Sequence, residues 1–298
     1  MPVRVRKRVF SSNRVLPYLL LFPAILVVIG IIYPWLLGLY QSFTDYSLLN
    51  PDKMIFIGAR NFADILFAKK GLHTVKITLL YGLYTTSIEL SLGILIAVLL
   101  NREKKGTRVL RAILPVPLMI APVIAGIMWK LMMDPSTGVI NYLLNTIGLP
   151  GSKWIYHTRT ALISIAVIDV WIFTPFIILI ILAGLSSVPQ GVYEASAIDG
   201  ANDFQNLFYI TIPIILPYIL LACVFRLIDS FKMFDLFYVA TKGGPGDATM
   251  NIPIWSYLTG LKELRMGRAM AGLQVLWVVN YVVAFVLLRF IERIRKLR

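Results

Sequence analysis

Four charged side chains recur at intervals of three residues within a hydrophobic run of membrane length: Arg226, Asp229, Lys232 and Asp235. A charge at the centre of a bilayer costs at least about 2.5–3.5 kcal/mol, so such residues usually face a protein interior or an aqueous path. On one helix each lies about a turn from the next, and opposite signs allow pairing. The spacing therefore fits either a self-neutralising structural ladder or the polar wall of a translocation route.

Two further acids, Glu89 and Asp169, are isolated within other apolar runs. Each fits either a structural partner for a cation on a neighbouring helix or a contact for a transported solute. Arg226 is the candidate cation for either acid. Trp171, close to Asp169, is a candidate for an interface or for the solute path.

A different kind of polar segment, YEASAIDGAN, spans Tyr193 to Asn202 and carries acids but no Lys or Arg. Ser187 can cap a helix there and Pro189 suits its first turn, while Gly200 fits a position after the helix that needs positive φ. Asn202 or Asp203 can cap a second helix that leads into the next apolar run. The segment is too short and too polar to span a membrane.

The composition of this short helix suits docking. Tyr193 and Val192 offer contact area, and Glu194 offers a directional charge, while small residues allow close approach: Ala195, Ser196 and Ala197. The residues themselves leave two interpretations, a docking element for another subunit or an ordinary connector.

The elements that position these residues are hydrophobic runs. The chain has 298 residues, of which 58% are hydrophobic and 15% charged, whereas about a quarter of a soluble domain is charged. Six runs approach the roughly 20 residues needed to cross a bilayer, which predicts an all-α membrane protein with six transmembrane helices: Leu16–Tyr40, Ile77–Leu100, Ala112–Met132, Ala161–Leu185, Pro213–Ala240 and Ala269–Phe290.

Positive charge flanks these runs, mainly in a basic tail at residues 1–15, the segment Arg102 to Arg111, and a basic tail at residues 291–298. This distribution explains the net charge of +14 without nucleic acid and favours cytoplasmic N- and C-termini, with anionic lipid headgroups nearby. The first apolar run is too long for a signal peptide and has no A-x-A site after it, so we interpret it as a retained span.

The sequence lacks the motifs of several common catalytic and nucleotide-binding sites. The sequence contains no G-x-x-x-x-G-K-[ST] phosphate loop, no H-E-x-x-H and no G-x-S-x-G. One cysteine and two histidines provide no disulfide and no clustered metal ligands. We therefore expect neither an enzyme nor a bound cofactor or metal.

The polar segment resembles the EAA loop of permease subunits of binding-protein-dependent ABC importers, in particular the sugar-type group related to the maltose system. The matching residues are Glu194-Ala195-Ser196, Asp199-Gly200-Ala201 and Ile210-Thr211-Ile212-Pro213, with Ser196 in place of the second Ala. The same group is similar in "LAGLSSVP", "FIGARNF", "DPSTGVINYLL" and "FRLIDSFKMFDLFYVATKGGPGDAT", so the resemblance covers most of the chain from about Leu16 onward.

The resemblance implies a type I ABC importer permease architecture in the cell membrane, with a six-span domain at residues 16–290 and a cytoplasmic coupling loop at residues 186–212. It implies a second permease subunit that forms a heterodimer with this chain, two ABC ATPase subunits that bind the ATP, and an extracytoplasmic binding protein that delivers a carbohydrate. The residues that it assigns to ATPase coupling are Glu194, Ala195, Ser196, Asp199, Gly200, Ala201 and Pro213.

Two alternatives from other classes remain open on the residues alone. One is a self-contained secondary transporter or channel that uses Glu89 and Asp169 as proton or cation sites. The other is an intramembrane enzyme, in which Asp169 and Asp229 could pair. The identity of the transported sugar is not encoded in any motif of this chain.

Overall fold

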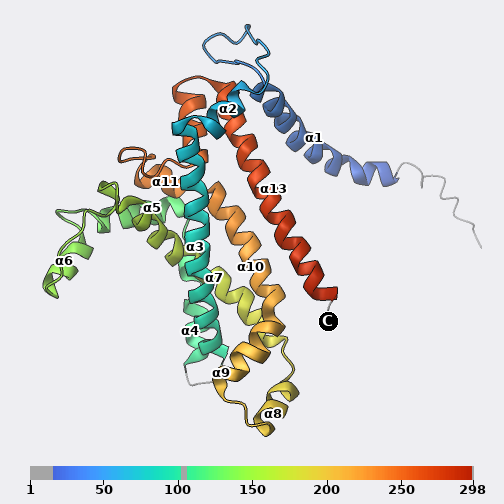
Figure 1. Ribbon diagram of the computed structural model, residues 1–298, viewed down its shortest axis with the longest axis vertical. Helices are drawn as coiled ribbons and strands as arrows, with labels where there is room; N and C mark the ends of the chain where they lie inside the picture. Colours follow the sequence, from blue (N-terminus) through green and yellow to red (C-terminus); the bar gives the residue numbers. More distant parts are fainter. Residues whose placement is uncertain (1–15, 102–105, 297–298) are drawn as a thin grey trace, which may run out of the picture.

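The computed structural model describes residues 16–101 and 106–296, and the basic N-terminal tail predicted at 1–15 lies outside that part. Five helices of the described chain are long and apolar enough to cross a membrane. They run as α1, α3, α7, α10 and α13 (Figure 1), over Leu16–Ser42, Lys69–Asn101, Ala161–Ser186, Ile212–Lys232 and Met266–Lys296. The last helix continues through residues 291–296, which were predicted as a tail.

The third predicted span, Ala112–Met132, is not one continuous helix. It consists of α4 (Thr107–Ile113), the 3₁₀ turn η1 (Val116–Met119) and α5 (Pro122–Met132), with a bend of 93° between its two halves. Proline lacks the amide hydrogen of a helix bond and its ring clashes with the preceding turn, and Pro115, Pro117 and Pro122 all lie in this stretch. The described chain thus has five spans, or six if the bent pair is one span.

The fifth predicted span, Pro213–Ala240, is also divided. Helix α10 ends at Lys232, and a separate helix α11 covers Asp235–Ala240. At the other end, α10 continues a capped first turn, α9 (Asp203–Gln205), and a π-helical segment, η3 (Asn206–Thr211).

Shorter elements join the spans. They are α2 (Arg60–Phe67), α6 (Val139–Thr146), η2 (Trp154–Tyr156), α8 (Gln190–Ile198), α12 (Ile252–Tyr257) and the π-helical η4 (Leu258–Lys262). Helices α2 and α11 lie toward one end of the bundle, whereas α4, α8 and α9 lie at the other (Figure 1). The C-terminal end of α13 points toward the end that carries α8.

The centre of the bundle is the contact of α3 with α7 and α10. Close approach depends on glycine: a Cβ at Gly93 would lie 2.4 Å from Ile177 Cγ2, and one at Gly82 would lie 2.3 Å from the Phe231 ring. Small residues that let helix backbones approach are the usual basis of helix packing in a bilayer, where lipid tails are as apolar as leucine.

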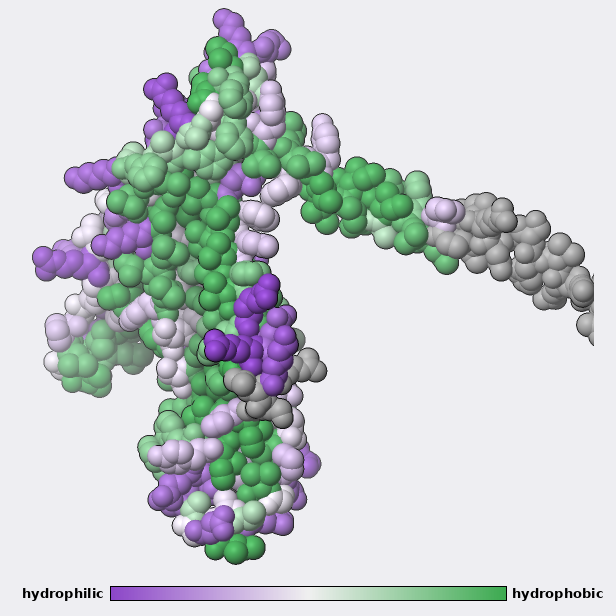
Figure 2. All heavy atoms as spheres, turned by 45° about the vertical axis from the view of Figure 1, so that its right-hand side comes forward, coloured by the Kyte–Doolittle hydropathy of each residue, from purple (hydrophilic) through white to green (hydrophobic). Residues whose placement is uncertain are grey.

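The outside of the molecule is apolar over the long helices, and hydrophilic residues gather toward the ends (Figure 2). Helix α1 leaves the bundle as an arm, and the C-terminal end of α1 contacts α13 (Figure 1). Its side chains are largely uncovered, including Tyr18 at 73% and Leu20 at 70% exposure. Such a surface requires lipid or protein as its neighbour rather than water.

Candidate functional site

Helix α8 begins directly after Pro189 and ends at Ile198, two residues before Gly200. Pro189 takes the extended N-cap position instead of the first turn predicted for it. The predicted capping role of Ser187 is wrong, because Ser187 ends α7, where its hydroxyl donates to the Gly184 carbonyl at 2.7 Å.

The end of α8 follows the sequence prediction. Gly200 has φ +76°, a left-handed conformation that favours glycine. The Ala201 amide donates to the Ser196 carbonyl at 3.0 Å, which closes the last turn. Asn202 then caps the next helix: its Oδ1 accepts from the Gln205 amide at 2.8 Å, and Gln205 Oε1 accepts from the Asn202 amide at 2.9 Å.

The residues predicted to couple to the ATPase differ in exposure and in the element that carries them. Glu194, Ala195, Asp199 and Gly200 are exposed on α8 and its turn, and the neighbouring Ile198 is 87% exposed. Ser196 faces inward and is 5% exposed, with its hydroxyl donating to the Tyr193 carbonyl at 2.8 Å. Ala201 lies in the turn itself.

Pro213 stands apart from this exposed group, at the start of α10 beyond η3. The face that α8 and its turn present outward therefore consists of small residues, an apolar tip and two carboxylates. The residues that face inward instead hold the helix in position.

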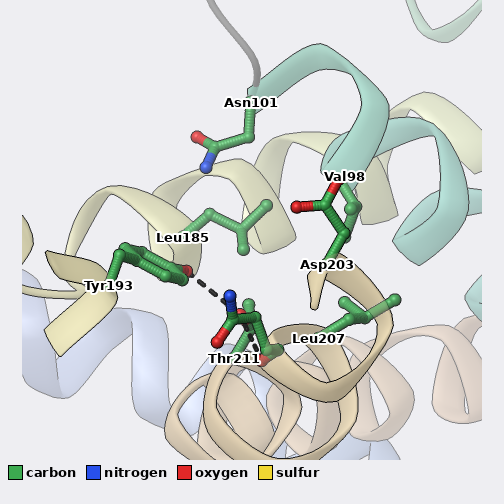
Figure 3. Close-up of a pocket in the computed structure, with 8 residues that line it drawn as sticks. Val98, Asn101, Leu185, Tyr193, Asp203, Leu207 and Thr211 are labelled. Atoms are coloured by element: carbon green, nitrogen blue, oxygen red, sulfur yellow. Dashed lines mark hydrogen bonds between the residues drawn. The ribbon is translucent and has the colours of Figure 1, made fainter. Parts of the chain in front are cut away.

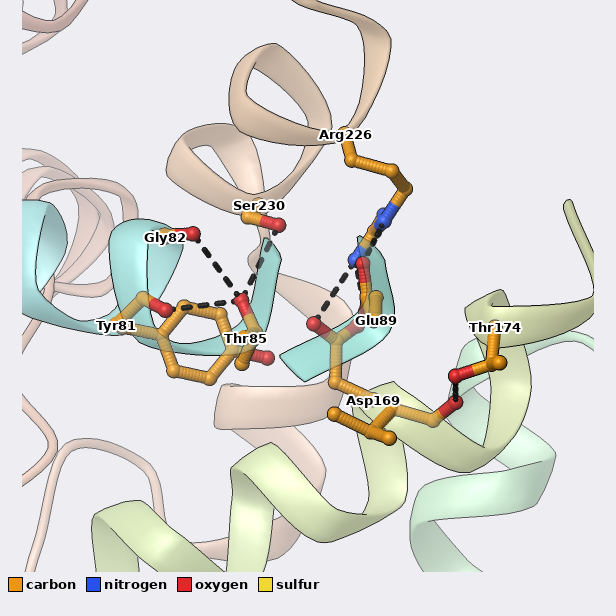
Figure 4. Close-up of polar contacts among 9 residues, drawn as sticks. Tyr81, Gly82, Thr85, Glu89, Asp169, Thr174, Arg226 and Ser230 are labelled. Carbon is orange, nitrogen blue, oxygen red and sulfur yellow. Dashed lines mark hydrogen bonds and ion pairs between the residues drawn. The ribbon is translucent and has the colours of Figure 1, made fainter. Parts of the chain in front are cut away.

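The isolated acids and the arginine form one buried cluster (Figure 4). Arg226 Nε and Nη2 donate to the two carboxylate oxygens of Glu89, at 2.6 and 2.8 Å, and Nη2 also donates to Asp169 Oδ2 at 3.0 Å. All three side chains are 0% exposed. The guanidinium lies 4.2 Å from the centroid of the Phe173 ring.

This cluster connects α10 with α3 and α7 by charge-assisted bonds, two of them in the parallel geometry that suits a guanidinium and a carboxylate. Its members are enclosed by protein, so direct contact with a solute would require the helices to separate. The geometry matches the prediction that Arg226 is the structural cation for both Glu89 and Asp169.

The four charged residues of the fifth predicted span do not form one continuous ladder of ion pairs, so that prediction is wrong. Arg226 points to the buried cluster, whereas Asp229 and Lys232 pair with each other at 3.3 Å and are about half exposed. Asp235 is exposed and begins α11, beyond the helix break. Trp171 packs against Trp129 of α5, with ring centroids 5.6 Å apart.

An aromatic group that the sequence analysis missed lies where α10 gives way to α11. Phe234, Tyr238 and Tyr257 have ring centroids 5.2–5.3 Å apart in each pair. Phe234 and Tyr257 also line a mostly apolar pocket of about 420 Å³. Phe234 and Tyr238 belong to the fifth predicted span, whereas Tyr257 comes from a different helix, α12.

Within the described ranges, no group of three or more His, Cys, Asp or Glu side chains could hold a metal ion. The features that the described residues do provide are a buried ionic junction, an aromatic pocket, and an exposed short helix between two spans. These features define a multi-pass α-helical membrane protein of the transport type.

Residues 89–296 match the family model described as "binding-protein-dependent transport system inner membrane component", and the chain belongs to this family. It is similar to a probable ABC transporter permease protein of Sinorhizobium fredii, with 39% identity over 90% of this chain and 86% of that protein. It is also similar to the trehalose/maltose transport system permease protein MalF of Thermococcus litoralis, with 32% identity over 91% of this chain and 92% of that protein.

The fold agrees with a solved structure. A chain of a bacterial ABC transporter involved in the import of the acidic polysaccharide alginate superposes with a TM-score of 0.82. The superposition covers 95% of this chain and 96% of that chain, at 24% sequence identity. The type I importer permease architecture expected from the sequence is thereby confirmed.

Proposed function

We propose that this permease subunit forms half of a carbohydrate path and is moved by separate ATPase subunits that hold α8. The observation that carries the proposal is the exposed short helix at one end of the bundle, ended by Gly200 in the left-handed conformation. Glu194, Ala195, Asp199 and Gly200 form its docking surface, Ala201 and Ser196 support it, and Pro213 begins the helix that it moves.

The energy source lies in other subunits. The chain lacks a phosphate loop, so two ABC ATPase subunits bind and hydrolyse ATP, and this chain has no enzymatic activity and no cofactor of its own. When the ATPases close, the differential contacts that they make with α8 favour one state of the spans over the other.

The remaining partners follow from the uncovered surfaces. Helix α1 presents an apolar arm away from the bundle, which a second, paralogous permease subunit and lipid cover. An extracytoplasmic binding protein delivers the solute at the end of the bundle opposite α8. The protein lies in the cell membrane with both termini cytoplasmic, an orientation supported by the α13 end that points toward α8 and carries Arg289, Arg293 and Lys296.

For the solute we propose a di- or oligosaccharide, the class named for the trehalose/maltose relative. Phe234, Tyr238 and Tyr257 offer aromatic faces for sugar rings. Asp229, Lys232 and Asp235, all exposed, are the nearby polar candidates for the path. Glu89, Asp169 and Arg226 support the path from behind, and Trp171 supports it through Trp129.

Co-purification and uptake test the proposal. Solubilised from its native membrane, the chain should bring with it a protein that carries a phosphate loop, identified by mass spectrometry. Uptake by vesicles should require ATP inside and the binding protein outside. E194K should abolish coupling while K262M, at an exposed position on the opposite end, should not; uptake driven by a proton gradient in the chain alone would overturn the proposal.

A further inference from the structure

Among the residues that the structure describes, one side-chain hydrogen bond joins α8 to the spans. The Tyr193 hydroxyl lies 3.1 Å from Thr211 Oγ1, at the end of η3 where α10 begins. In the described chain no other side-chain hydrogen bond joins α8 to a neighbouring helix, since the Ser196 hydroxyl bonds back within α8. Its other attachments include the connection from α7 through Val188 and Pro189, the turn at Gly200, and apolar contact of Tyr193 with the cluster that includes Leu185.

The direction of this bond can be assigned from the next one. The Thr211 hydroxyl donates to the Asn206 carbonyl at 3.1 Å, five residues earlier, which is the spacing of one π-helical turn. A hydroxyl has one proton to give, so when both bonds are formed Tyr193 is the donor and Thr211 the acceptor. A chain of bonds then runs from the Tyr193 hydroxyl through Thr211 to the Asn206 carbonyl, and each strengthens the other.

The bond lies beside a hollow (Figure 3). Tyr193 and Thr211 both line this pocket of about 220 Å³, together with Asn101, Leu185 and Leu207. Asn206 also lines it, and its Oδ1 is buried without a hydrogen-bond partner among the described residues. Water can occupy a polar space of this size, so a water molecule can replace the Thr211 hydroxyl as the partner of the Tyr193 hydroxyl when the bond opens.

Thr211 is 5% exposed and is well placed to transmit a displacement. It lies two residues before Pro213, and α10 runs from there to Arg226, whose side chain binds Glu89 of α3 and Asp169 of α7. A pull on Tyr193 is therefore applied to a helix that is connected to two others by ionic bonds. Transmission needs such a contiguous element with two arrangements.

We infer that the Tyr193–Thr211 hydrogen bond is a latch that sets the angle of the coupling helix against α10 and passes a displacement of that helix to α10. Tyr193 and Thr211 are thus positioning residues for coupling. This inference rests on the proposed function, because it assigns a role to the helix that the ATPases hold.

Hydrogen–deuterium exchange of the purified chain reads the latch directly. Y193F and T211V should each speed amide exchange across Gln190–Ile198 by a few-fold up to about tenfold, the effect of one ordinary hydrogen bond. The double variant should add little to T211V, because T211V already removes the bond that Y193F removes. T211S keeps the hydroxyl and should retain slow exchange, and Y142F removes the hydroxyl of an exposed tyrosine on α6 as a control.

The functional readout is ATP hydrolysis by the complex that contains the co-purifying ATPases, with and without the binding protein. Y193F and T211V should still assemble, yet lose most of the stimulation by the binding protein, and T211S should restore it. Unchanged α8 exchange in Y193F and T211V overturns the latch. Faster exchange with normal stimulation overturns its role in coupling.

The two proposals fail differently. If the wild-type chain assembles with no ATPase, the proposed function fails and the coupling role of the latch fails with it, while the exchange measurement still reports the bond. If the wild-type complex is stimulated normally and Y193F behaves identically, only the latch is overturned.

Discussion

The buried cluster at Arg226 encloses its charges, whereas the coupling segment, which consists of α8 and its turn up to Ala201, exposes them. In the cluster, a cation and two carboxylates are 0% exposed and bind one another at 2.6–3.0 Å. On α8 and its turn, Glu194 and Asp199 are exposed, and no ion pair holds them within the described chain. Enclosed charges fix three helices relative to one another, whereas exposed charges leave a surface for another protein.

Because of this difference, substitutions in the buried cluster should affect the stability of the fold, whereas substitutions on α8 should affect coupling. Removing one partner of a buried ion pair is strongly destabilising, because the remaining charge stays buried without compensation. Removing an exposed charge costs the fold little. Variants in the two regions should therefore differ in what they damage, the folded bundle in one and the transport cycle in the other.

The largest effect on the fold should come from R226M. Methionine fills part of the space but leaves Glu89 and Asp169 buried without a cation, so we expect a loss of about 3–5 kcal/mol in the free energy of unfolding. Chemical unfolding in detergent micelles measures it. The matched control is K232M on the same helix, whose partner Asp229 is half exposed and for which about 0–1 kcal/mol is expected; equal losses in both variants would contradict the comparison.

A smaller loss should follow from G93A, one turn from Glu89 on α3. The added methyl would lie 2.4 Å from Ile177 Cγ2, so α3 and α7 must separate or Ile177 must move, and overpacking of this kind costs about 1–3 kcal/mol. The same unfolding experiment applies. G30A, at a position with nothing within 4 Å of the added carbon, is the control and should unfold like the wild type.

In the coupling segment, G200A should cost the fold only about 1 kcal/mol, because alanine is strained at φ +76° but meets open space. Transport should fall far more if, as proposed, the turn sets how α8 faces the ATPase. The measurement is the ratio of solute taken up to ATP hydrolysed in vesicles. If uptake declined only in proportion to the folded fraction, the turn would have no separate role in coupling.

The smallest effect concerns the loop between α5 and α6. Asp134 Oδ1 accepts from the amides and hydroxyls of Ser136 and Thr137, which lowers the pKa of Asp134 from 3.8 to about 2. A depressed carboxyl pKa stabilises the folded turn above about pH 4, and this contribution is lost as the pH falls toward 2.

Exchange of the Ser136 and Thr137 amides in the purified chain measures that turn. Their protection, after correction for the intrinsic pH dependence of exchange, should decrease between about pH 4 and pH 2. D134N should remove the pH dependence, while the α8 amides should be unaffected by this substitution. A pH profile that D134N leaves unchanged would assign the effect to another group.

Much of the architecture follows from the sequence because hydrophobic length and turn chemistry are local. Gly200 and Asn202 take the positions predicted for them, since a left-handed turn and an N-cap depend on residues within one helical turn. The apolar runs likewise predicted the long helices, with ends that shift by several residues.

What the sequence did not predict depends on distant contacts. Helix α10 ends near Met233 because the buried Asn251 side chain donates to the Met233 carbonyl at 2.6 Å, a contact across 18 residues of chain that no helical pattern contains. The same break separates Asp235 from Arg226. Tyr257 joins Phe234 and Tyr238 only through the packing of α12, so local spacing could not reveal the aromatic group.

Site-specific cross-linking from α8 tests the central claim most directly. A photoreactive amino acid at Ala195, in the complex assembled in membranes, should form a covalent adduct with the phosphate-loop ATPase, identified by mass spectrometry. The same amino acid at Tyr142 on α6 should form none. An active, ATP-driven importer in which Ala195 forms no adduct with the ATPase, while another surface of this chain does, would contradict the account.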